Sequence, residues 1–108
     1  MAYDPGLAQI LRDDLHPLPV TEKRMMGGLC FLLNDHMVCC ALGEGALFRP
    51  GKAAQAEALR LEGVGTMSLT GRVMTGFVAA TAETVADDSR RAQLLRLSLD
   101  FVATLPPK

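Results

Sequence analysis

The stretch that decides the fold is Lys23-Arg24-Met25-Met26-Gly27-Gly28-Leu29-Cys30-Phe31-Leu32. A charged approach leads into a glycine pair and then into an apolar run, which predicts a strand, a bend and a second strand. Glycine has no Cβ and reaches positive φ at little cost, so this pair lets the backbone turn or lets a neighbouring strand pack closely. A second glycine-centred segment, residues 69–78, repeats the pattern, and we expect two hairpin regions.

Outward from this stretch, the chain alternates apolar runs with turn signals. Asp4-Pro5 can begin a helix, because aspartate caps free amides and proline suits the first helical position. Asp87 or Thr84 can cap a C-terminal helix that Pro106-Pro107 ends. The sequence predicts an α+β fold with an antiparallel sheet backed by helices, in the order α-β-β-β-β-α-β-β-α. The expected elements are a helix over 5–16, strands over 20–26, 29–33, 36–42 and 46–49, a helix over 52–61, strands over 67–69 and 73–80, and the C-terminal helix.

The hairpin around Asn34-Asp35 has a predicted register. A two-residue loop there would place Leu33 opposite His36 and, further along, Cys30 opposite Cys39. Cys40 would then lie on the other face of the sheet. Both faces would be apolar, whereas an antiparallel sheet usually leaves one face to water. Helices would cover one face, and the other would be covered either by a partner subunit, as in a homodimer, or by the protein's own helices and loops.

Length and composition limit the class of protein. A chain of 108 residues fits one domain, residues 1–108. The net charge of -1, with acids and bases interleaved, provides no strong field for nucleic acid or for an anionic membrane surface. The sequence has no signal-peptide pattern and no long apolar run, and its three cysteines lack the even spacing of a disulfide framework. We therefore expect a cytoplasmic protein with reduced thiols.

Few residues are candidates for chemistry. Phosphate-binding loops, nucleophile elbows and dinucleotide-binding glycine motifs are missing from the sequence. His36 stands near Cys39 and Cys40 at a spacing found in zinc sites, but a second ligand pair is missing, and a solvated histidine is the simpler interpretation. Cys30 and Cys39 could form a redox pair or remain inert buried thiols. We expect no metal and no cofactor.

Two motifs carry a resemblance to a known family. Met25-Met26-Gly27-Gly28 is similar to a pattern of methionine, an aromatic residue and two glycines, with Met26 in the aromatic position. The later motif consists of Thr70, Gly71, Arg72, Met74, Gly76 and Phe77. With these motifs the chain resembles the N-terminal domain of the TfoX/Sxy family along nearly its whole length. The resemblance implies an α+β fold similar to secretion-chaperone-like domains. It gives no catalytic residues.

The resemblance also implies a class of function. Full-length members of the family are regulators of natural competence genes that act with the cyclic-AMP receptor protein at promoters, and they carry a second, helical domain. We expect this chain to be a stand-alone N-terminal domain without that second domain. We expect a bacterial, non-enzymatic protein-interaction domain that acts as a transcriptional co-regulator through a protein partner, without direct contact to nucleic acid or membrane. The alternative is a small-ligand or thiol-redox sensing domain centred on Cys30 and Cys39. The basic residues near the strands could recognise an acidic partner or be ordinary solvated charges; they are Lys23, Arg24, Arg49 and Arg72.

Overall fold

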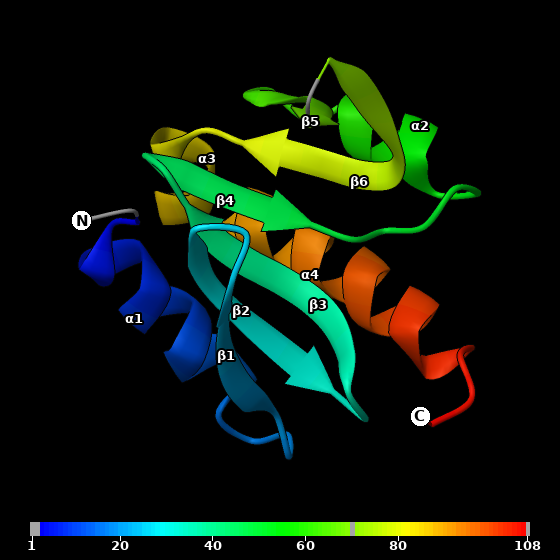
Figure 1. Cartoon of the computed structure of the whole chain (residues 1–108). Coiled ribbons are helices and arrows are strands. Elements are labelled where there is room, and N and C mark those ends of the chain that lie inside the picture. The colour runs from blue at the N-terminus through cyan, green and yellow to red at the C-terminus, as the bar shows by residue number, and fades with distance from the viewer. Residues whose placement is uncertain (1–2, 70, 108) are drawn as a thin grey trace.

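The computed structural model describes residues 3–69 and 71–107. Within these residues a six-stranded sheet is accompanied by four helices (Figure 1). The elements are α1 (Pro5–Leu15), β1 (Thr21–Met25), β2 (Gly28–Leu33), β3 (His36–Leu42), β4 (Gly45–Phe48), α2 (Gln55–Leu59), β5 (Val64–Leu69), β6 (Arg72–Ala80), α3 (Ala82–Ala86) and α4 (Asp88–Ala103). The strand order is β1-β2-β3-β4-β6-β5, with every neighbouring pair antiparallel. The predicted fold class and element order are confirmed, with the last helical region divided into α3 and α4.

Side-chain caps fix where three of the four described helices begin, and α2 is the exception. The Asp4 carboxylate accepts a hydrogen bond from the Gly6 amide at 2.7 Å, directly before Pro5 at the start of α1. Thr81 caps α3, and Asp87 caps α4 by accepting from the Arg90 amide at 2.8 Å. Asp87 thus has the role expected for it. None of the helices in the described part of the chain is long and apolar enough to cross a membrane.

Two tight turns form the first three strands into a meander. Met26 and Gly27 have φ angles of 59° and 78°, and Asn34 and Asp35 have φ angles of 54° and 65°. Two consecutive residues with positive φ are typical of the two-residue turns that match strand twist. The first bend therefore comes one residue earlier than predicted, and Gly28 belongs to β2, where it pairs with Met25.

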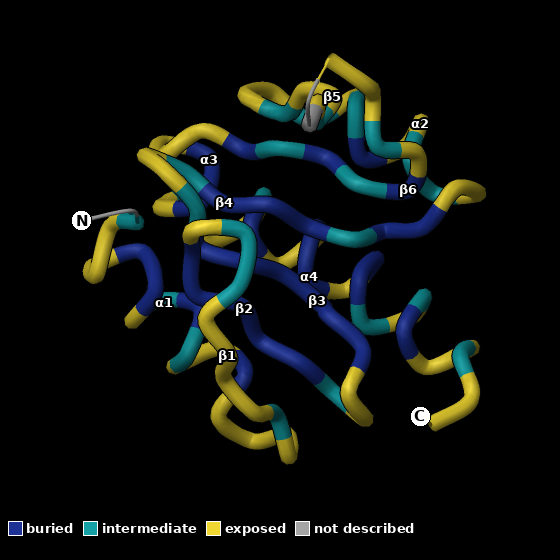
Figure 2. The backbone as a smooth tube through the Cα atoms, viewed as in Figure 1, coloured by how far each residue is buried: buried dark blue, intermediate teal, exposed yellow. Residues whose placement is uncertain are grey.

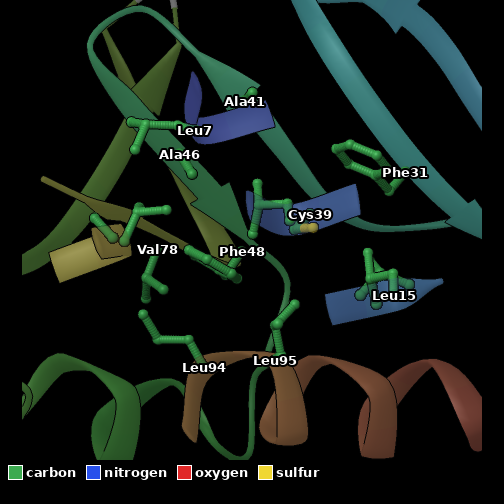
Figure 3. Close-up of a cluster of buried hydrophobic side chains, with 14 of the residues drawn as sticks. Leu7, Leu15, Phe31, Cys39, Ala41, Ala46, Phe48, Val78, Leu94 and Leu95 are labelled. Carbon is green, nitrogen blue, oxygen red and sulfur yellow. The ribbon is translucent and has the colours of Figure 1, made fainter. Parts of the chain in front are cut away.

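The helices bury one face of the sheet. The larger apolar cluster, which we call the helix-side core, combines residues of all four helices with one face of the strands (Figure 3). Phe31 and Phe48 of the sheet and Leu11, Leu15 and Leu94 of the helices are its largest fully buried members. Figure 2 shows the central strands and the inner faces of α1 and α4 as mostly buried. The amphipathic helices provide the expected backing of the sheet.

The opposite face carries a second, smaller apolar cluster. Its buried members are Cys30, Leu32, Met37, Cys40 and Leu47. Around them lie partly buried side chains of Met25, Met26, Leu42, Met67 and Phe77. Among the described residues no helix contributes to this cluster, so strands and a turn of the sheet provide its cover. We call this side the open face.

The cap of α4 predicts a dependence of stability on pH. Hydrogen bonds from the Arg90 amide and then from its side chain hold the pKa of Asp87 below the usual value of an aspartate. Because the pKa is lower in the folded state, the stabilisation is present above the unfolded pKa and is lost as pH falls through the folded pKa. We expect Asp87→Asn to melt below the wild-type protein at about pH 7 and the gap to narrow towards about pH 2. A gap in melting temperature that stays constant over this range would contradict the charged cap.

Candidate functional site

A groove on the open face is the candidate binding site. Its volume is about 320 Å³, and Lys23, Met25, Met26, Leu32, Asp35, Met37, Arg49, Met74 and Phe77 line it. Four of the six methionines in the sequence are among these residues, and Met67 lies in the cluster beside them. Unbranched thioether side chains adapt to differently shaped apolar partners. We call this feature the methionine groove.

Arg49 brings a charge to the groove. It follows β4, and its guanidinium carbon lies 5.5 Å from the ring centre of Phe77 and 5.3 Å from that of Phe101. Both distances are in the range of cation–π contacts. Neither Arg49 nor Lys23 forms an ion pair within residues 3–69 and 71–107. Two cations are therefore held at an apolar groove that contains one acidic side chain, Asp35.

A bend in β6 places Phe77 beneath Arg49. The pairing of β5 with β6 shifts between Thr66, which faces Val78, and Ser68, which faces Val73, so β6 has extra residues here. Gly76 lies in this bend with a φ of 89°, its amide donates to the Gln55 side-chain oxygen at 2.8 Å, and its carbonyl accepts from the Gly51 amide at 3.1 Å. A positive φ in a strand favours glycine. The bend at Gly76 thus connects the groove to Gly51, before α2, and to Gln55, the first residue of α2.

The cysteines are arranged differently from the prediction. Leu33 faces His36 and Leu32 faces Met37 as expected, but a bulge then shifts the register, so that Phe31 faces Cys39 and Cys30 faces Cys40. The predicted pairing of Cys30 with Cys39 is wrong because Val38 is an extra residue on β3. Cys39 belongs to the helix-side core, whereas Cys30 and Cys40 lie together on the open face.

The two open-face thiols interact directly. The Sγ atoms of Cys30 and Cys40 are 2.6 Å apart, and both side chains are fully buried. The hydrogen bond with Cys40 lowers the pKa of Cys30, because a donated proton stabilises the Cys30 thiolate, and the same bond raises the pKa of Cys40. Burial raises the pKa of Cys39. Cys30 is therefore the thiol that ionises most readily.

The zinc interpretation of His36 finds no support. This side chain is buried, not solvated as expected, and its Nε2 lies 2.7 Å from the Pro106 carbonyl oxygen. Within the described residues, no three histidine, cysteine or acidic side chains lie close enough together to hold a metal ion. His36 instead connects the β2–β3 turn to the C-terminal segment.

A comparison with family models identifies the chain. The model of the TfoX N-terminal domain matches residues 14–102, most of the sequence. The chain belongs to the TfoX N-terminal domain family. Searches of curated proteins and of solved structures found no match. The membership confirms the resemblance seen in the two glycine motifs and names no enzyme activity.

The structure brings together parts of both TfoX motifs. Met25 of the first and Met74 and Phe77 of the second line the methionine groove, while Gly27 and Gly28 shape the hairpin beside it. Gly71 and Arg72 lie instead at the tip of the β5–β6 hairpin, where both are exposed, and Thr70 lies outside the described residues. The motifs therefore meet at the groove only through their apolar members and glycines.

Sequence reasoning missed several groove residues. Met37 and Leu32 come from the centre of the sheet, and Asp35 comes from the turn between β2 and β3. Arg49 was identified as a basic residue near a strand, but its position between two aromatic rings was not expected. The unusual signal was the methionine content, because β1, the turn after it, β3 and β6 each place a methionine at the groove.

Proposed function

We propose that this TfoX N-terminal domain is a non-enzymatic protein-interaction domain whose methionine groove binds an apolar segment of a partner protein flanked by acidic residues. The observation that carries the proposal is the lining of the groove, which combines four adaptable methionine side chains with two cations, Lys23 and Arg49. Neither cation forms an ion pair within the described residues, so both can meet the carboxylates of a partner. Apolar side chains of the partner would enter the groove, and its carboxylates would meet Lys23 and Arg49. Family membership supports a partner from the transcription machinery and a role as co-regulator of competence genes.

Charge complementarity favours this partner over a nucleic acid. The groove combines two cations with one carboxylate and a mostly apolar lining, whereas nucleic-acid surfaces place many cations along a phosphate track. The aromatic content is also low, with one tyrosine, four phenylalanines and no tryptophan to stack on bases. An acidic, apolar protein segment is the ligand whose chemistry matches the lining.

A pair of matched glutamate variants tests the proposal. Met74 lines the groove, whereas Val73 is 57 % exposed on the same strand and is not part of the lining. Each variant adds the same charge, but only Met74→Glu places it inside the groove. Proteins captured from bacterial lysate by the wild-type domain would be identified, purified and titrated against each variant. We expect Met74→Glu to lose at least about tenfold in affinity and Val73→Glu to stay within about twofold.

Other results would contradict the proposal. Equal affinity of both variants for the purified partner would exclude the groove as its site. Capture of the domain alone, with a doubled mass in sedimentation that Met74→Glu abolishes, would show that a second copy occupies the groove. Thermal melting of each variant separates loss of binding from loss of folding.

A further inference from the structure

The proposed binding function does not involve the two open-face thiols, Cys30 and Cys40. We propose that Cys30 and Cys40 form a reversible dithiol–disulfide pair that is oxidised by hydrogen peroxide. The pair lies in the same small cluster as Leu32 and Met37, which line the methionine groove. This proposal concerns the free domain and does not depend on the identity of its partner.

The register provides the geometric basis. Cys30 and Cys40 are direct cross-strand partners on neighbouring antiparallel strands, and their side chains point to the same face. Direct cross-strand positions have Cα separations of about 4.5–5.5 Å, within the range that disulfides span. The two sulfur atoms are 2.6 Å apart, so no other atom lies between them. A bond can form here without rearranging the strands.

The same geometry argues against a shared metal ion. Two thiolates bound to one tetrahedral zinc ion would stand about 3.8 Å apart, given zinc–sulfur bonds of about 2.3 Å. The two sulfurs are much closer than this, and within the described residues no third histidine, cysteine or acidic side chain completes a ligand set. Oxidation is the chemistry that this pair fits.

The reaction can be written with all atoms accounted for. The Cys30 thiolate attacks one oxygen of hydrogen peroxide, the O–O bond breaks, and a sulfenic acid and hydroxide form. The Cys40 thiol then attacks the Cys30 sulfur, forming the S–S bond, and the sulfenic oxygen leaves as water. Overall two thiols and one peroxide give one disulfide and two waters. A small-molecule dithiol reverses the reaction by thiol–disulfide exchange and is itself oxidised.

The order of attack follows from the environment of each sulfur. Cys30 is the first nucleophile because its hydrogen bond with Cys40 lowers its pKa, whereas the pKa of Cys40 is raised. The Cys30 sulfur also lies 3.9 Å from the Met25 carbonyl oxygen, next to the groove. Cys39 faces the helix-side core, where burial raises its pKa, so it remains a thiol.

Mass spectrometry of the full-length protein tests the proposal directly. After treatment with hydrogen peroxide, the intact chain should lose two hydrogens, and the free thiols should fall from three to one per chain. A dithiol reductant should restore all three. Trypsin leaves the three cysteines in one peptide, so cleavage before Asp35 is needed to separate Cys30 from Cys39 and Cys40. The two fragments should remain joined until reduction.

Alanine variants identify the bond. Cys39→Ala is the matched control, because it removes a neighbouring thiol on the opposite face and should keep the two-hydrogen loss and the joined fragments. Cys30→Ala and Cys40→Ala should each abolish both. The wild-type result does not depend on how well the variants fold. Fragments joined through Cys39, disulfide-linked dimers, or oxidation confined to methionines would each overturn the proposal.

Discussion

Phe31→Ala is expected to lower the free energy of unfolding by about 3–5 kcal/mol. Phe31 is fully buried in the helix-side core, between the sheet and the helices. Removing its ring costs the burial of apolar surface and leaves a cavity that a closely packed interior only partly fills. A domain of this size has a total stability of about 5–15 kcal/mol, so the variant should fold but melt far below the wild type.

Phe77→Ala is the matched comparison, because it makes the same change on the open face. Phe77 is only partly buried and lines the methionine groove, so we expect a loss of no more than about 2 kcal/mol. Urea unfolding followed by circular dichroism would measure both variants, since the chain has no tryptophan for fluorescence. If Phe77→Ala cost as much as Phe31→Ala, the groove would be part of the core and not a binding surface.

The sequence alone predicted the secondary-structure elements and the fold class. Apolar periodicity and turn chemistry were enough to predict the fold class. Asn34-Asp35 and the glycine pair at Gly27-Gly28 are local signals, because such residues favour the positive φ angles of tight turns. The caps at Asp4 and Asp87 were found for the same reason. Local patterns therefore predicted which elements form and where most of them begin.

The pairing of the cysteines could not be predicted in the same way. A single bulged residue, Val38, exchanges the faces of Cys39 and Cys40, and apolar residues on both faces leave no polar signal to reveal the shift. The groove depends on a second irregularity, the bend at Gly76, which brings Phe77 next to Arg49. Both irregularities lie between consecutive strands, but extra residues in one strand change the register without leaving a periodic signal in the sequence.

Gly28→Ala is expected to destabilise the protein by about 1–3 kcal/mol, although it adds only one methyl group. A Cβ at this position would overlap the Ala41 carbonyl oxygen of the neighbouring strand and would lie 3.1 Å from the Cys40 sulfur. The carbonyl belongs to the backbone of β3 and cannot rotate away as a side chain could. The strands must therefore separate at the point where β2 begins.

Gly27→Asn is the matched control in the same hairpin. Gly27 has a φ of 78°, and nothing lies within 4 Å of an added Cβ. Asparagine tolerates this backbone conformation, so we expect a loss below about 1 kcal/mol in the same urea measurement. A larger loss for Gly27→Asn than for Gly28→Ala would mean that turn conformation, not close strand contact, explains the glycine pair.

The Gly28→Ala variant should also change the oxidation of the thiols. Because the added methyl group presses on the Cys40 sulfur, Gly28→Ala should slow the loss of free thiols in peroxide, whereas Gly27→Asn should leave that rate unchanged.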